Sequence, residues 1–141
     1  MSEKISVDAQ ALVTLNDGHV MPQLGLGVWR TPPAETARVV RLAVELGYRS
    51  VDTARHYENE DGVGEGLEGH PEVFVTTKLW NAEQGYDRAL KAFDESARLL
   101  RRPIPDLFLL HWPMPTPGQH VETRQARAQV KQDGRGHSVG V

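Results

Sequence analysis

The stretch VFVTTK, residues 73–78, decides the fold of this chain. Its β-branched and aromatic residues predict a strand, and that strand delivers Lys78 at its end. Two further predicted strands also lead into ionisable residues, one at Asp52 and one at His111, and Tyr57 follows the first of them closely. Because a parallel barrel brings the carboxyl ends of its strands to one rim, we expect these side chains to share one site.

Helices are predicted before and after this stretch. Apolar residues recur at the spacing of one helical face over residues 86–100. An earlier helix is predicted over residues 32–46, with Gly47 as its left-handed cap, and a short one over residues 60–67, which its three glycines weaken. Strands that alternate with helices indicate a parallel sheet, either closed into a barrel or open and doubly wound. The predicted strands occupy residues 24–29, 49–52, 73–77, 107–110 and 138–141.

A hairpin is predicted before the alternating strands and helices, and a proline-rich loop after the fourth strand. The turn residues Asn16, Asp17 and Gly18 lie between short apolar stretches, which predicts a β-hairpin over about residues 12–22, with the barrel units over about residues 24–141. The apolar run at residues 107–110 is bounded by prolines and predicts a strand buried on both faces. After it, Pro113, Pro115 and Pro117 predict a stiff loop.

Length and composition narrow the classes of function. A chain of 141 residues suits one domain, residues 1–141, although a complete (β/α)8 barrel usually needs roughly 250 residues. The formal net charge of -3 gives no field that would recruit nucleic acid, and the absence of cysteine excludes disulfides and thiolate metal sites. No apolar run approaches the length of a membrane span, and the first ten residues lack the apolar stretch of a signal peptide, so we expect a cytoplasmic protein.

The polar residues at the strand ends suit the reduction of a carbonyl group. Tyr57 would be the acid that protonates the carbonyl oxygen, since a neighbouring ammonium from Lys78 would stabilise its phenolate. Asp52 would keep that lysine charged and in place, and His111 would hold the substrate oxygen by a hydrogen bond.

Each of these residues also has an ordinary structural interpretation. Asp52 alone would be a turn cap, Lys78 a solvated charge, His111 a core imidazole and Tyr57 a packed ring. Their joint placement at strand ends favours the functional interpretation. No metal site is predicted, because His56, His111 and Asp52 lack a ligand spacing.

Several motifs resemble the aldo-keto reductases, in particular the bacterial branch similar to 2,5-diketogluconate reductase. They are LGLG at 24–27, VDTA at 51–54 with Tyr57, NEDGVG at 59–64, TTKLWN at 76–81 and LLHWP at 109–113. The resemblance covers about residues 12–141. It implies an α/β protein with a parallel (β/α)8 barrel of the TIM-barrel type, cut to about its first half, with an N-terminal hairpin. It also implies NADPH-dependent reduction of an aldehyde or ketone to an alcohol.

The same resemblance assigns roles to residues of this chain. The catalytic residues would be Asp52, Tyr57, Lys78 and His111, with Tyr57 as the proton donor. The residues around a small-molecule carbonyl substrate would be Trp29, Trp80, Trp112 and His56. The cofactor contacts would be Gly27, Val28, Trp29 and Asp52.

This chain departs from the family pattern in two ways. Family members continue well beyond the length of this chain, and the missing half supplies most cofactor contacts, so we expect weak or no turnover. Arg124 and Arg127 stand where the family has a tryptophan and a leucine, so we expect the helix at residues 121–133 to be frayed or absent. Exposed strand edges predict self-association. The alternative is a non-catalytic half-barrel that acts as an interaction module or results from a broken gene.

Overall fold

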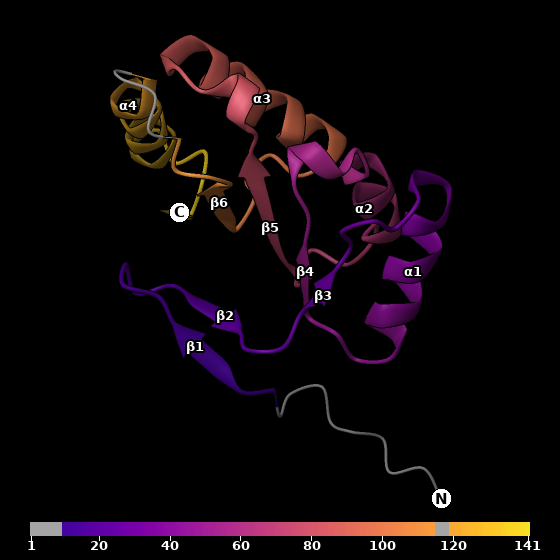
Figure 1. Ribbon diagram of the computed structural model, residues 1–141. Helices are drawn as coiled ribbons and strands as arrows, with labels where there is room; N and C mark the ends of the chain where they lie inside the picture. Colours follow the sequence, from indigo (N-terminus) through magenta and orange to yellow (C-terminus); the bar gives the residue numbers. More distant parts are fainter. Residues whose placement is uncertain (1–9, 115–118) are drawn as a thin grey trace, which may run out of the picture.

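The computed structural model describes residues 10–114 and 119–141, in which five strands form one parallel sheet (Figure 1). Pro115 and Pro117 of the predicted loop lie outside the described residues. Each strand pairs with the next one in the chain, as in a barrel, and this order excludes the doubly wound alternative, in which the order reverses. The strands are β3 (Leu26–Gly27), β4 (Ser50–Asp52), β5 (Phe74–Leu79), β6 (Leu107–Leu110) and β7 (Ser138–Gly140).

Four α-helices lie in an arc along one side of this sheet (Figure 1). Two short 3₁₀ helices, η2 and η3, follow β4 and β5, and the sequence did not predict them. The helices are α1 (Pro33–Glu45), η2 (Arg55–Tyr57), α2 (Glu60–Gly66), η3 (Asn81–Glu83), α3 (Tyr86–Leu99) and α4 (Gln119–Gln132). The sheet and its helices confirm the α/β barrel-type fold, whereas the assignment of residues 1–141 to a single domain stays a prediction.

Helix α4 corrects one expectation. We expected a frayed or absent helix, but α4 has 14 residues. Thr123, Ala126 and Val130 are buried along one face of it. The Thr123 hydroxyl also accepts a hydrogen bond of 2.8 Å from the backbone N–H of Gly85, just before α3. Contacts with α3 and the sheet therefore stabilise a helix whose own apolar content is low.

Strand β6 corrects another expectation. We predicted burial on both faces, but Phe108 and Leu110 are buried whereas Leu107 and Leu109 are only half-buried. The helices cover one face of β6, and Phe108 packs there against Phe93 of α3 with ring centroids 5.1 Å apart. The other face of the sheet points away from all four helices (Figure 1).

The N-terminal hairpin confirms the prediction for residues 12–22. Strand β1 (Leu12–Thr14) pairs antiparallel with β2 (Val20–Pro22), and Gly18 in the turn has a φ of 88°. The hairpin lies on the side of the sheet away from the helices (Figure 1). The turn reaches the last elements of the chain through an ion pair of 3.2 Å between Asp17 and Lys131.

Helix α2 shows why three glycines interrupt its sequence. An added Cβ at Gly62 would lie 2.7 Å from the Cβ of Thr36, and one at Gly66 would lie 2.7 Å from the Cβ of Val40. At Gly64 an added Cβ would overlap the backbone at the end of α3. The glycines therefore let α2 pack closely against α1 and α3, which offsets their low helix propensity. No helix in the described ranges combines the length and hydropathy that a membrane crossing requires.

Candidate active site

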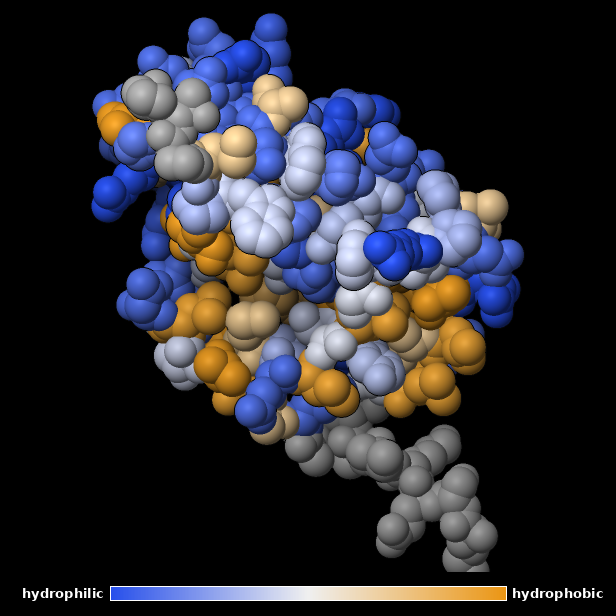
Figure 2. Space-filling view, viewed as in Figure 1, coloured by the Kyte–Doolittle hydropathy of each residue, from blue (hydrophilic) through white to orange (hydrophobic). Residues whose placement is uncertain are grey.

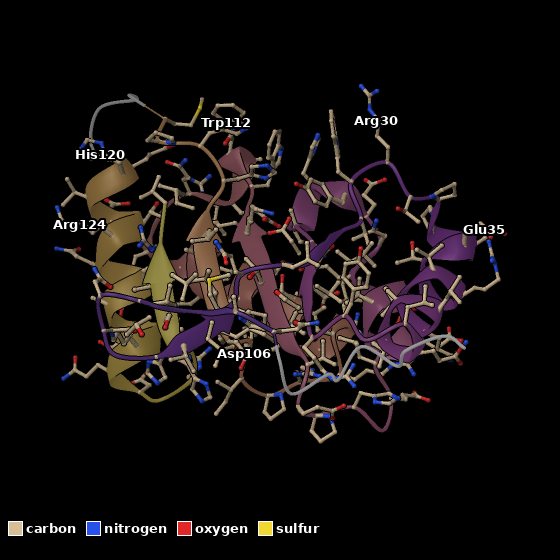
Figure 3. The ribbon with its side chains drawn as sticks, turned by 90° about the horizontal axis from the view of Figure 1, so that it is seen from below. Arg30, Glu35, Asp106, Trp112, His120 and Arg124 are labelled. Atoms are coloured by element: carbon tan, nitrogen blue, oxygen red, sulfur yellow. The ribbon has the colours of Figure 1, made fainter. Side chains whose placement is uncertain are left out.

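The carboxyl ends of the strands lie at one edge of the molecule. Figure 3 shows Trp112, which follows β6, at the edge opposite to Asp106, which precedes β6. Asp52 ends β4, Lys78 is the penultimate residue of β5, and His111 follows β6. The parallel sheet therefore brings together the three strand-end residues that the sequence singled out.

Lys78 connects the residues of this rim. Its ammonium Nζ donates to Oδ2 of Asp52 at 2.6 Å, to the carbonyl oxygen of Thr53 at 3.0 Å and to the hydroxyl of Tyr57 at 3.5 Å. Only 13% of the Lys78 side chain is exposed. A desolvated ammonium is stable when a carboxylate and further acceptors surround it, and here Asp52 is that carboxylate.

Tyr57 reaches the ammonium because η2 turns the chain back toward the sheet. The Tyr57 N–H donates to the carbonyl of Ala54 at 3.0 Å, and Glu58 then takes a left-handed conformation with a φ of 55°. The sequence pattern gave no sign of this turn, since three residues are too few for a helical period.

His111 lies next to both Tyr57 and Trp80. Its ring centroid is 5.7 Å from that of Tyr57 and 5.4 Å from that of Trp80, edge-on in both cases. Burial, and secondly the charge of Lys78, lower the pKa of the imidazole below its ordinary value, so the ring is neutral near neutral pH. Its buried Nδ1 has no hydrogen-bond partner among the described residues.

Aromatic rings extend this rim on both sides of His111. His56 stacks on Trp80 with centroids 3.7 Å apart, and Trp112 lies parallel to the His111 ring at 6.2 Å. Trp112 is 57% exposed, and Trp29, just past β3, is 62% exposed. The guanidinium of Arg30 covers the Trp29 ring at 4.4 Å. The rim therefore offers polar hydrogen-bonding groups beside apolar surface, as small-molecule sites do.

A sequence model of a known family matches this chain. The model is that of the aldo/keto reductase family, and it matches residues 21–141. The chain belongs to the aldo/keto reductase family.

Named relatives and solved structures agree with this membership. Methylglyoxal reductase DkgA of Escherichia coli is 41% identical over 134 residues, which cover 92% of this chain and 48% of that enzyme. Morphine 6-dehydrogenase of Pseudomonas putida is 46% identical over 134 residues, covering 92% of this chain and 45% of that enzyme. The crystal structure of a Gox0644 variant in complex with NADPH is 65% identical with a TM-score of 0.92, covering 94% of this chain and 49% of that one. The chain thus spans about half the length of the curated relatives it matches.

The predicted cofactor contacts of this family member differ in their surroundings. Gly27 pairs in register with Asp52, and an added Cβ at Gly27 would meet nothing within 4 Å, so open space borders its backbone beside the Asp52 carboxylate. A cofactor contact by Gly27 stays a prediction. Val28 is fully buried, its N–H donates to the backbone carbonyl of Asp52, and its own carbonyl accepts from Asn59, so a cofactor contact by Val28 stays a prediction.

Asn59 links two loops of the site by hydrogen bonds, a role that the sequence analysis did not predict. Buried Asn59 donates from its amide to the carbonyl of Val28 at 2.9 Å and accepts from the hydroxyl of Thr53 at 2.8 Å. It thereby fixes the loop after β3 to the loop after β4. Strand β3 itself is Leu26–Gly27, shorter than the predicted strand at 24–29. The motif that contains Asn59 was noted only as part of the family resemblance. Within residues 10–114 and 119–141, no group of three or more histidine or acidic side chains is placed to hold a metal ion.

Proposed function

We propose that this site reduces an aldehyde or ketone to an alcohol with NADPH as the reductant. The observation that carries the proposal is the position of the Lys78 ammonium, 2.6 Å from Asp52 and 3.5 Å from the hydroxyl of Tyr57, whose ring lies 5.7 Å from that of His111. The names of the relatives, which include a methylglyoxal reductase, and the NADPH complex of Gox0644 support this chemistry.

In this proposal each residue has one task. Bound NADPH would supply a hydride to the carbonyl carbon. The Tyr57 hydroxyl gives its proton to the carbonyl oxygen, and the phenolate that remains is stabilised by the Lys78 ammonium. Asp52 holds that ammonium in place. A neutral His111 retains one ring N–H, which donates a hydrogen bond to the same carbonyl oxygen and orients it.

The surroundings of the substrate are part of the same proposal. Trp80, stacked on His56, would form one wall beside His111, and the exposed rings of Trp29 and Trp112 would enclose the rest of a small carbonyl compound. Gly27 would leave room for the nicotinamide beside Asp52.

Turnover of NADPH with an aldehyde tests the proposal. We expect weak oxidation of NADPH by the 141-residue chain with methylglyoxal or glyceraldehyde, measured by the absorbance of the reduced nicotinamide. Tyr57→Phe removes the proton donor and should lower kcat by about 10²- to 10⁴-fold. Calorimetric titration with NADPH is measured in parallel. Absence of both turnover and saturable binding in the unaltered chain would contradict the proposal.

A second candidate, a non-catalytic interaction module that associates with itself, is favoured by the exposed apolar side chains. Hydrophobic residues gather over the lower part of the face in Figure 2, where the hairpin lies. Leu12, Val13, Val20 and Leu24 are among the exposed ones. Strands β3 and β7 each pair on one side only within the described residues. Such edges and patches favour association. Analytical ultracentrifugation tests it, and a monomer at all concentrations would contradict it. A cytoplasmic location stays a prediction from the sequence.

A further inference from the structure

Arg55 begins the 3₁₀ helix η2, two residues before Tyr57. Its Nε donates to Oε1 of Glu83 at 3.0 Å, and its Nη1 lies 3.9 Å from Oε2 of Glu60. The Arg55 side chain is 33% exposed, so this guanidinium is partly desolvated. One cation therefore pairs with two carboxylates from different elements, Glu60 at the start of α2 and Glu83 at the end of η3.

Both carboxylates also bind the chain around Lys78. Oε1 of Glu60 accepts a hydrogen bond of 2.5 Å from the hydroxyl of Thr77, the residue before Lys78. Oε2 of Glu83 accepts from the backbone N–H of Trp80, two residues after Lys78, at 3.3 Å. Arg55 is thus linked to the end of β5 on both sides of the lysine.

Glu60 depends on this arrangement. Only 2% of the residue is exposed, and burial raises the pKa of its carboxyl above the ordinary value. The guanidinium of Arg55 is the positive group nearest to its Oε2 in the ion pairs of the structure, at 3.9 Å. The hydroxyls of Thr77 and Ser96 and the charge of Arg55 lower the pKa of this carboxyl and so partly offset the effect of burial. A buried carboxylate without such a partner would be strongly disfavoured.

Two contacts of the candidate active site also join η2 to the end of β5. The hydroxyl of Tyr57 lies 3.5 Å from the Lys78 ammonium, at the outer limit of a hydrogen bond, so a small movement of η2 would break it. The ring of His56, next to Arg55, stacks at 3.7 Å on Trp80. Each contact depends on how closely η2 is held to the end of β5.

We propose that Arg55 is a positioning residue that holds η2 against the end of β5 through Glu60 and Glu83, and so sets the separation of the Tyr57 hydroxyl from the Lys78 ammonium. Its effect on catalysis rests on the proposed function, whereas the positioning itself does not. A misplacement of about 1 Å at a proton donor is enough to lower a rate by up to roughly 10²-fold.

The ring protons of His56 report the position of η2 without any need for turnover. Stacking on Trp80 shifts these protons upfield, and the resonances are assigned among the six histidines of the chain with His56→Asn. In Arg55→Ala we expect at least half of that upfield shift to disappear. Arg38→Ala is the matched control, because Arg38 forms an exposed ion pair with Glu35 on α1.

Two further variants protect this test against misfolding. Glu83→Gln keeps an acceptor for the Trp80 N–H but removes the charge that Arg55 meets, so it should lose a smaller part of the shift. Arg55→Lys keeps one cation and should recover part of it. If Arg55→Ala and Glu83→Gln both leave the His56 resonances at the positions found in the Arg38→Ala control, the proposal is wrong.

Kinetics then separate positioning from the proposed function. In Arg55→Ala we expect kcat to fall about tenfold with the KM for NADPH unchanged, because the proton donor is displaced and the cofactor contacts are not. An unchanged kcat together with a lost His56 shift would overturn the catalytic part of the proposal. A chain that shows neither turnover nor saturable binding of NADPH would argue against the proposed function, and the His56 shift would still decide the positioning.

Discussion

Two partly buried cations of this chain differ in what surrounds them. The Lys78 ammonium has three oxygen acceptors, from Asp52, Thr53 and Tyr57. Arg127 on α4 has a buried Nε that finds no hydrogen-bond partner among the described residues. Burial, and secondly the charge of Arg124, lower the pKa of the Arg127 guanidinium below its ordinary value. Burial alone therefore does not distinguish the two cations, whereas the acceptors around Lys78 do.

The surroundings of Arg127 strengthen this contrast. It lines a hollow of about 470 Å³ whose wall includes the apolar Leu110, Met114 and Val141 and two further basic side chains, His120 and Arg124. Lys78 instead projects from a strand end into a ring of polar atoms. Arg127 is therefore expected to weaken the fold, whereas Lys78 is expected to take part in the proposed reduction.

The largest loss of activity should come from removing the charge of Lys78, the cation with three acceptors. Lys78→Met keeps the length of the side chain but removes the charge that would stabilise the Tyr57 phenolate, so kcat/KM should fall by about 10³-fold. Steady-state oxidation of NADPH measures it. Lys91→Met, an exposed change on α3, is the control and should retain full activity. Equal activity in the two variants would remove Lys78 from the mechanism.

A smaller loss of activity is expected when Lys78 is kept and its partner Asp52 is neutralised. Asp52→Asn leaves Lys78 with the Thr53 carbonyl and the Tyr57 hydroxyl as acceptors. A hydrogen bond to a charged group contributes roughly 2 kcal/mol, so kcat/KM should fall about 30-fold. Asp87→Asn in the first turn of α3 is the matched control. A loss as large as that of Lys78→Met would mean that Asp52 has a direct role in the reaction.

Replacing Arg127, the cation without a partner, should be beneficial, because it should stabilise the fold. Arg127→Leu removes a half-buried cation that also faces the charge of Arg124, and it should raise the free energy of unfolding by about 1 kcal/mol. Urea unfolding measures the change. Lys91→Leu, which alters an exposed position of α3 away from this hollow, should change stability by less than about 0.5 kcal/mol. Destabilisation by Arg127→Leu would show that the guanidinium has a partner.

The smallest expected effect concerns a buried charge of the other sign, Glu60. Its pKa in the folded chain is raised above the ordinary value of 4.5 by burial. The folded state therefore binds more protons than the unfolded state between these two pKa values, and stability falls as the pH rises through that window. Glu60→Gln should remove this fall, measured by urea unfolding at several pH values between 4.5 and neutrality. A pH dependence identical to that of the unaltered chain would contradict the assignment.

The sequence predicted the parts of the fold that repeat. Apolar periodicity placed α3, and strand composition placed β5 and β6 to within two residues. Gly47 takes the predicted left-handed conformation after α1, with a φ of 102°. These features depend on local side-chain pattern and backbone geometry, which a sequence displays directly.

Features that depend on contacts between distant residues could not be predicted in the same way. Helix α4 is stabilised by the bond between Thr123 and Gly85, which no periodicity reveals. The positions of Tyr57 and His56 depend on η2, and the link from Arg55 to Glu83 spans 28 positions of the chain. The members of the candidate site were identifiable as polar residues near strand ends, but the groups that hold them in place were not.

The sequential strand order has a consequence for how the chain acquires its structure during synthesis. Because each strand pairs with its predecessor, every new β-α unit can dock on those already made, and most of the sheet can assemble as the chain leaves the ribosome. The N-terminal hairpin differs from the sheet, because one of its contacts is with a much later part of the chain. Its ion pair between Asp17 and Lys131 joins positions 114 apart, so a segment that is translated before the sheet completes this contact only after α4 has been made.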